Sequence, residues 1–105
     1  MKFKFEELDR ARKILGLDEE ATLYEVRNNY YELSKKFHPD RCKGNKKECE
    51  EKFKEITQAY NLIMEYIACF RISFKEKDVE RMSIDKVTYK HLKQFYDGWW
   101  ENLDY

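Results

Sequence analysis

The residues best suited to chemistry gather in one short stretch, KKFHPDRCKGNKK, which spans residues 35–47. His38 and Asp40 flank Pro39, the only proline of the chain, so a hydrogen-bonding ring and a carboxylate lie on either side of a residue with a fixed backbone angle. A carboxylate of this kind can pair with an arginine of another protein through two parallel hydrogen bonds. Pro39 and Gly44 suffice for a turn, so His38, Asp40 and Arg41 require another explanation.

The residues of this stretch could in principle form a catalytic site or a metal site. No serine elbow, phosphate-binding glycine loop or paired carboxylate site stands out, and His91 is expected to pack on an apolar helix face. His38, Cys42 and Cys49 lie within twelve residues of each other, but zinc sites usually show CxxC-like pairs and four ligands. We therefore predict no enzyme activity, no metal and no cofactor, with a zinc site as the open alternative.

The three cysteines indicate a compartment. An odd number at irregular spacing argues against a disulfide framework, so the simplest location is a reducing cytoplasm. A disulfide between Cys42 and Cys49 across the loop remains the lesser alternative. Cys69 is expected to be a small buried apolar residue.

Length and composition predict one folded domain with a charged surface. The chain has 105 residues, of which 42% are hydrophobic, 40% charged and 16% aromatic, and this aromatic content argues against disorder. The net charge is zero, so no global electrostatic attraction to nucleic acid or to an anionic membrane is expected. No apolar run approaches the roughly 20 residues that span a bilayer, and the charged start MKFKFEELDR is no signal peptide.

Apolar periodicity and capping residues predict an all-α fold. A short helix is expected over about 4–15, with Gly16 ending it in a left-handed cap, and a second helix over about 23–37. Thr22 and Glu25 have the spacing of a capping box that would start the second helix, and Pro39 ends it. Its expected apolar stripe comprises Leu23, Val26, Tyr30, Leu33 and Phe37.

A loop over about 38–46 leads to a third predicted helix, about 47–68, for which Asn45 and Glu48 could form a second capping box. Two long helices joined by a short loop, each with one apolar stripe, should pack as an antiparallel hairpin with the loop at its exposed tip. The stripe expected on the third helix comprises Phe53, Ile56, Tyr60, Ile63 and Ile67.

Residues 71–105 predict a helical, aromatic-rich C-terminal extension. Ser73 and Glu76 offer a third capping box for a short helix through about Met82, and Ser83 could cap a final helix that places His91 and Trp99 on one face. This extension is expected to fold against the hairpin or to offer an apolar surface to a client or adaptor protein.

The sequence KFHPDR after a capped helix, ILGL before that helix and EEKFKEITQAYNLI after the loop together resemble a J domain, the defining module of DnaJ-type (heat shock protein 40) cochaperones. The resemblance covers about residues 4–67. It implies a J-domain helical bundle over residues 1–70 that docks on a DnaK-type heat-shock-70 chaperone through the HPD loop and the second helix. The family stimulates ATP hydrolysis by that partner in protein folding and catalyses nothing itself.

The resemblance also implies which residues face the partner. His38, Pro39 and Asp40 match the family signature, and Arg41 extends the match. The positions that often contribute to the same surface are Arg27, Tyr30, Lys36 and Lys54.

This chain departs from the family in the middle of the second helix. Typical members carry a basic pair where this chain has Tyr31 and Glu32, and Asn28 replaces another usual basic residue. The electrostatic attraction should therefore be weaker, which predicts low affinity for a generic partner or a partner whose own surface differs.

Absences indicate a subtype. No Gly/Phe-rich linker and no CxxCxGxG repeat appears, so the resemblance is to a J-domain-only protein. Two alternatives stay open: a degenerate J domain that serves only as a protein-interaction scaffold, and a weak nucleic-acid-binding helical module. The lysines around the loop favour nucleic-acid binding, although nearby glutamates neutralise their charge.

Overall fold

The computed structural model describes residues 2–81, 86, 89 and 90, and its regular elements there are helices, which confirms the all-α prediction. The helices are α1 (Phe5–Ile14), α2 (Leu23–Phe37), α3 (Lys46–Ala68) and α4 (Glu76–Arg81). In the described part, no helix is long and apolar enough to cross a membrane. The chain divides into two compact units, residues 1–71 and 72–105.

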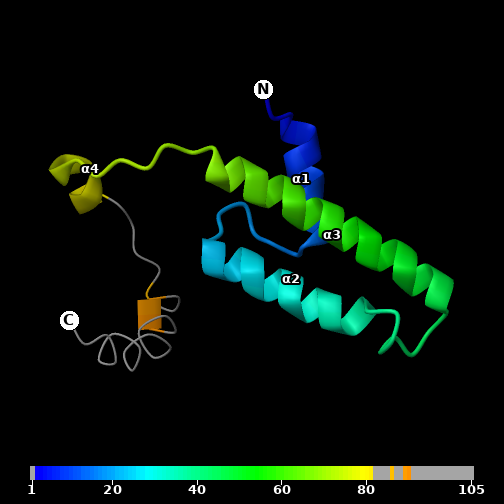
Figure 1. The fold of residues 1–105 in the computed structure, drawn as a ribbon. Helices are drawn as coiled ribbons and strands as arrows, with labels where there is room; N and C mark the ends of the chain where they lie inside the picture. Colours follow the sequence, from blue (N-terminus) through cyan, green and yellow to red (C-terminus); the bar gives the residue numbers. More distant parts are fainter. Residues whose placement is uncertain (1, 82–85, 87–88, 91–105) are drawn as a thin grey trace, which may run out of the picture. The chain divides into compact units, whose positions relative to one another are not determined.

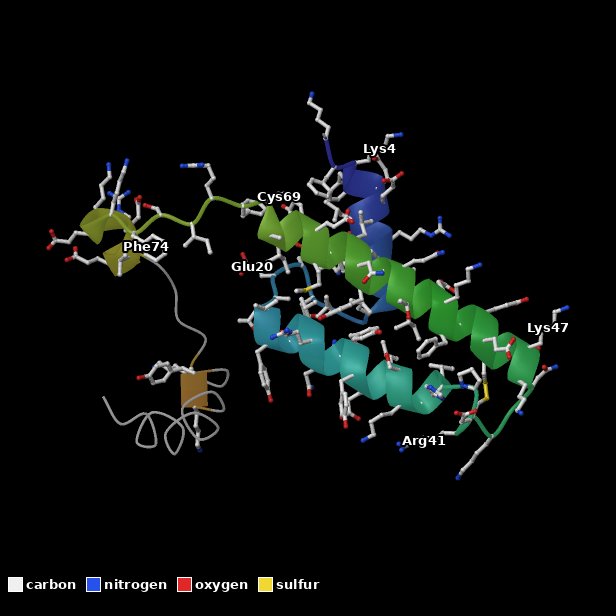
Figure 2. All side chains as sticks on the ribbon, viewed as in Figure 1. Lys4, Glu20, Arg41, Lys47, Cys69 and Phe74 are labelled. Carbon is white, nitrogen blue, oxygen red and sulfur yellow. A yellow bond between two sulfur atoms is a disulfide. The ribbon has the colours of Figure 1, made fainter. Side chains whose placement is uncertain are left out.

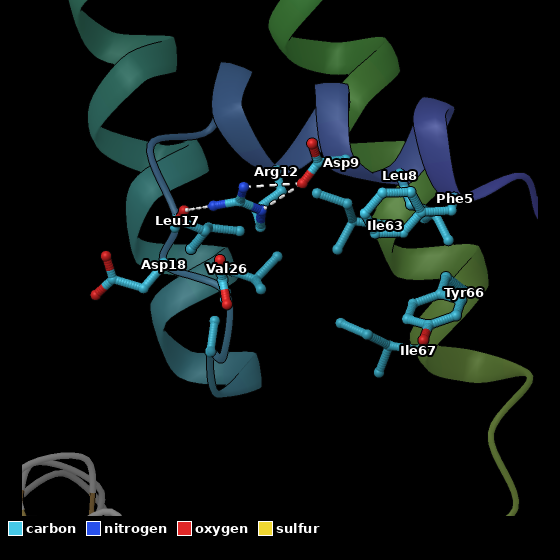
Figure 3. A pocket seen from close by; sticks show the side chains of 12 residues that line it. Phe5, Leu8, Asp9, Arg12, Leu17, Asp18, Val26, Ile63, Tyr66 and Ile67 are labelled. Carbon is cyan, nitrogen blue, oxygen red and sulfur yellow. Dashed lines mark hydrogen bonds and ion pairs between the residues drawn. The ribbon is translucent and has the colours of Figure 1, made fainter.

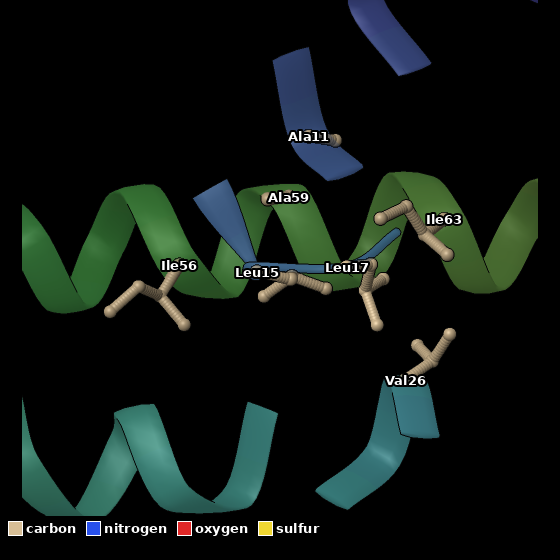
Figure 4. Packing of buried hydrophobic residues seen from close by; sticks show 7 residues of the cluster. All are labelled: Ala11, Leu15, Leu17, Val26, Ile56, Ala59 and Ile63. Carbon is tan, nitrogen blue, oxygen red and sulfur yellow. The ribbon is translucent and has the colours of Figure 1, made fainter. Parts of the chain in front are cut away.

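The first unit is built on α3. Both α1 and α2 pack against it, and α2 and α3 run side by side as an antiparallel hairpin whose connection lies at one end (Figure 1). Seven buried apolar residues from these helices and from the segment after α1 form the core in Figure 4: Ala11, Leu15, Leu17, Val26, Ile56, Ala59 and Ile63. Helices α1 and α2 therefore share one core on α3.

The end of α1 is closed by the residues predicted for it. Gly16 has φ +66°, the left-handed conformation that glycine adopts without strain, and its N–H donates to the carbonyl of Lys13. Arg12 then holds the following segment, because its Nη1 donates to the Leu17 carbonyl at 2.8 Å (Figure 3). The same guanidinium pairs with the Asp9 carboxylate at 2.8 Å, so one arginine joins α1 to the chain that leads to α2.

Both ends of α2 follow the sequence prediction. Thr22 and Glu25 form the capping box, with the Glu25 N–H donating to Thr22 Oγ1 at 3.1 Å. The helix ends at Phe37, and His38 is already extended at φ −60° and ψ 131°. Pro39 explains this conformation, because its ring excludes the residue before it from helical geometry.

The start of α3 differs from the prediction. Asn45 caps the helix by accepting a hydrogen bond from the Lys47 N–H at 2.9 Å, but the described residues show no capping box with Glu48. The box fails because the Asn45 oxygen is engaged two residues ahead, whereas a box requires it to accept from the third.

Most of the predicted apolar stripes lie on the core, but the residues at which the stripes begin do not. Ile56 and Ile63 are buried, and Tyr30, Leu33, Phe37, Tyr60 and Ile67 are half-buried against the cluster. Leu23, which is expected in the apolar stripe of α2, is 44% exposed, and Phe5 is 73% exposed. Each is the first residue of its helix.

The second unit contains α4. The predicted Ser73–Glu76 capping box is wrong, because the Ser73 hydroxyl donates to the Asp78 carboxylate and accepts from the Lys75 N–H, and α4 begins only at Glu76. The helix predicted from Ser83, with the places expected for His91 and Trp99, lies outside the described residues.

Candidate functional site

The loop between α2 and α3, residues 38–45, turns sharply at its start. The carbonyl of His38 accepts from the N–H groups of Arg41 and Cys42, at 3.0 and 2.9 Å. Pro39 and Asp40 therefore occupy the apex of a closed turn, and Pro39 restricts the backbone there. The backbone of this turn therefore fixes where the side chains of His38 and Asp40 begin.

The imidazole of His38 is held from two sides. Its Nδ1 accepts from the Asp40 N–H at 3.2 Å, and its ring stands edge-on to Phe53 of α3 with 5.4 Å between centroids. Since Nδ1 accepts a hydrogen bond, the proton of the neutral ring lies on Nε2. His38 thus offers a donor, Nε2–H, to any group that approaches the loop.

The carboxylate of Asp40 is largely exposed. Its side chain is 85% exposed, and its Oδ2 lies 3.8 Å from His38 Nδ1. In the described part of the chain, no lysine or arginine forms an ion pair with it. The carboxylate is therefore free to accept both N–H groups of an arginine fork.

A shallow hollow of about 430 Å³ connects this turn with both long helices, and we call it the loop hollow. The residues that line it are Tyr31, Ser34, Lys35, His38, Asp40, Arg41 and Phe53. The Ser34 hydroxyl is buried and has no hydrogen-bond partner among the described residues. Lys35 places its Nζ 5.1 Å from the centre of the Tyr31 ring, a cation–π arrangement.

The other residues expected on this surface are more dispersed. Arg27, Lys36 and Lys54 are exposed on the helices and do not line the loop hollow. Tyr30 is half-buried, and its ring stacks on Tyr60 of α3 with centroids 3.9 Å apart and 11° between planes. The loop hollow thus gathers His38, Asp40 and Arg41, while Tyr30 joins α2 to α3.

Sequence reasoning missed Ser34 and Phe53 as site residues, although a signal was present. Ser34 and Lys35 lie three and four residues after Tyr31, and His38 lies four and three residues after them, which places all four along one face that leads from α2 to the turn. Phe53 is the first residue of the α3 stripe and contacts the loop instead of the core cluster.

The cysteine predictions need correction. Cys42 and Cys49 form a disulfide, with their Cα atoms 6.4 Å apart, drawn as the yellow bond at the loop end of Figure 2. The odd number of cysteines argues against a disulfide framework and leaves this pair as the lesser alternative, because a count does not register that a seven-residue separation returns the chain to α3. Cys69 is a free thiol and exposed directly after the last turn of α3, so its predicted burial is wrong.

The described residues hold no group of three His, Cys, Asp or Glu side chains that could bind a metal ion. The site is therefore a surface of hydrogen-bonding and charged groups around one turn. Glu32 is exposed on α2 among basic side chains and makes no ion pair with another described residue.

Comparison with known proteins places this surface in context. The family model described as DnaJ domain matches residues 4–66, which contain α1, α2, the loop and most of α3. No solved structure matches the chain.

Curated relatives match over about half of this chain. Chaperone protein DnaJ of Thermoplasma acidophilum is 53% identical over 51 residues, which are 49% of this chain and 14% of the relative. Chaperone protein DnaJ of a Wolbachia species from Brugia malayi is also 53% identical over 51 residues, 49% of this chain and 13% of its own length. That of Thermosipho africanus is 51% identical over 51 residues, which are 49% of this chain and 14% of its length. The match therefore spans only about one-seventh of each of these relatives.

Proposed function

Because this chain belongs to the DnaJ domain family, we propose that it is a cochaperone that docks on a DnaK-type heat-shock-70 chaperone and stimulates ATP hydrolysis by that partner. The docking surface comprises the α2–α3 loop and the adjoining face of α2. ATP hydrolysis takes place in the partner, so no catalytic residue is assigned to this chain.

One observation carries the proposal: the Asp40 carboxylate is 85% exposed beside an imidazole that α3 holds in place. An arginine of the partner can bind this carboxylate through two parallel hydrogen bonds, and the Nε2–H of His38 can donate to an adjacent acceptor. Pro39 lowers the conformational entropy that the turn loses on docking. Three neighbouring residues thus supply a charge, a donor and rigidity.

The loop hollow supplies the surrounding contacts. Phe53 and Tyr31 line it, so a side chain of the partner that enters it meets an apolar wall. Arg41 lines the hollow as well and adds a positive charge beside the Asp40 carboxylate. A rim with both charges restricts the orientation in which a partner can bind.

The other residues expected to face the chaperone have weaker support. Arg27, Lys36 and Lys54 are exposed, so they can contribute rim charges that raise the association rate. Tyr30 contributes by fixing α2 on α3, since its ring is engaged with Tyr60. We propose that the basic residues act on association and that Tyr30 acts on the geometry of the surface.

A binding measurement tests the assignment of Asp40. Titration of an ATP-loaded DnaK-type chaperone with wild-type protein should give saturable binding, and Asp40→Asn should weaken it about tenfold or more, because a charge-assisted bidentate pair is lost. Asp18→Asn is the matched control, because Asp18 is an exposed carboxylate in the segment before α2. Equal affinities for wild type and Asp40→Asn would refute the assignment.

Two wider parts of the proposal extend beyond this surface. We propose that residues 71–105 recruit a client or adaptor protein, because Phe70, Ile72 and Phe74 leave large apolar side chains exposed where the extension begins. We also propose a cytoplasmic location. There the Cys42–Cys49 disulfide would be exposed to a reducing pool of thiols.

A further inference from the structure

Cys42 and Cys49 line a second surface hollow beside the α2–α3 loop, with a volume of about 660 Å³, which we call the cysteine hollow. The hollow is strongly basic: five cationic side chains and one acidic side chain line it, namely Lys35, Lys36, Arg41, Lys43, Lys52 and Glu48. The basic side chains of the hollow therefore attract a small negatively charged molecule towards the disulfide.

The two sulfur atoms differ in their surroundings. Cys42 lies half-buried in the loop, whereas Cys49 is 7% exposed and sits in the first turn of α3, with its N–H donating to the Asn45 carbonyl. A nucleophile that enters the hollow reaches Cys42 first. Cys49 is the better leaving group, since a helix N-terminus and nearby cations stabilise a thiolate.

We propose that the cysteine hollow is a thiol–disulfide exchange site for an anionic low-molecular-weight thiol and its disulfide, and that exchange there ties or releases the docking loop. The preference for an anionic reagent follows from the excess of basic side chains in the wall. The part that concerns docking rests on the proposed function, whereas the exchange chemistry does not.

Reduction takes two steps that balance. A thiolate RS⁻ attacks Sγ of Cys42, forms a mixed disulfide there and expels Sγ of Cys49 as a thiolate. A second RS⁻ attacks the sulfur of the bound RS group, which releases RSSR and the Cys42 thiolate, and both cysteine thiolates take protons from water. Two RSH are oxidised to one RSSR, and oxidation of the protein is the reverse with RSSR as the oxidant.

The consequence for docking follows from loop entropy. The disulfide joins the loop at Cys42 to α3 at Cys49, so it limits the conformations of a segment that begins two residues after Asp40. With the bond open, the loop has more freedom to lose when it docks. The disulfide form should therefore reach half-maximal stimulation of the chaperone at about threefold to tenfold lower concentration than the dithiol form.

The chemical half is tested on the full chain with two reagents of opposite charge. The fully reduced protein is treated with glutathione disulfide or with cystamine, and thiol loss is followed at each cysteine by peptide mass mapping. Cys69 is the internal reference, since it is exposed and free. Relative to Cys69, the Cys42–Cys49 pair should react several-fold faster with glutathione disulfide than with cystamine, and 1 M salt should reduce this preference. An identical reagent preference at Cys69 and at the pair would overturn the proposal.

A charge variant and a docking assay complete the test. Lys43→Gln with Lys52→Gln should remove much of the preference for glutathione disulfide, whereas Lys77→Gln in α4 should leave it unchanged. In the chaperone assay, the oxidised protein is compared with its reduced form and with Cys42→Ser. Equal half-maximal concentrations would overturn the docking half. If no form stimulates the chaperone while the reagent preference holds, the proposed function fails and the exchange site stands.

Discussion

The ring of His38 in the α2–α3 loop stands edge-on to the ring of Phe53 in α3, with 5.4 Å between centroids and 78° between planes. This contact and the hydrogen bond from the Asp40 N–H to Nδ1 together fix the imidazole. Because α3 also packs against α1 and α2, the helix at the centre of the unit orients the ring that the loop presents. The core of the fold and the docking surface are therefore joined through one aromatic pair.

Replacing Phe53 should weaken docking more than stability. Phe53→Leu keeps an apolar side chain and removes the aromatic edge, so the half-maximal concentration for chaperone stimulation should rise about threefold. The matched control is Phe3→Leu, because Phe3 makes a similar edge-on contact with Tyr66, at 5.5 Å and 78°, away from the loop. Equal effects of the two variants on stimulation would show that the contact of Phe53 with His38 contributes no more to docking than the contact of Phe3 with Tyr66.

The stacked pair of Tyr30 and Tyr60 should stabilise the hairpin. In urea unfolding, a double-mutant cycle with Tyr30→Leu and Tyr60→Leu should give a coupling free energy of about 0.5–1.5 kcal/mol. Tyr30→Phe retains the ring and should unfold at nearly the wild-type urea concentration. A coupling free energy of zero would mean that the two rings contribute independently.

Asp9 should make stability depend on pH in the acid range. Hydrogen bonds from Arg12 and then from Lys13 hold the pKa of the Asp9 carboxyl below its ordinary value of 3.8. A group with a lowered pKa in the folded chain stabilises it above the ordinary pKa, and this contribution disappears as the pH falls through the folded value. Asp9→Asn should therefore lower the melting temperature at pH 7.

The difference in melting temperature between wild type and Asp9→Asn should shrink as the pH falls below 3.8. Asp18→Asn is the control, because Asp18 forms no ion pair with a described residue. A difference that persists unchanged at the lowest pH would assign the effect to packing and not to the charge of Asp9.

Charge reversal at Glu32 should strengthen the electrostatic attraction between α2 and the partner. Glu32→Arg should raise the association rate with the chaperone and steepen its dependence on salt, since a rim charge acts mainly on diffusional encounter. Glu65→Arg makes the same change of net charge in the last turn of α3, and it should have a smaller effect. Unchanged stimulation and salt dependence in Glu32→Arg would refute this interpretation of the α2 surface.

The helices were predictable because local signals define them. Gly16, the Thr22–Glu25 pair and Pro39 act through their own backbone neighbourhoods, so their effects are visible in the sequence. The turn residues His38 and Asp40 were likewise visible, since their types exceed what a turn requires. In each case the physical cause lies within a few residues.

The features that escaped prediction, or that the sequence offered only as a lesser alternative, depend on contacts between segments. The placement of Phe53 against His38 and the pairing of Cys42 with Cys49 follow from how the loop returns to α3. Phe5 and Cys69 are both exposed at the end of a helix. Apolar periodicity identifies a face of a helix, but it does not say where along that face the cover ends.

Steady-state ATP hydrolysis by a DnaK-type chaperone, measured with increasing wild-type protein beside His38→Gln, tests the central claim most directly. The account predicts saturable stimulation by the wild type and a loss of most of it in His38→Gln, with the melting temperatures of both proteins nearly equal. Stimulation that persists in His38→Gln, or its absence in the wild type with a cognate chaperone, would contradict the account.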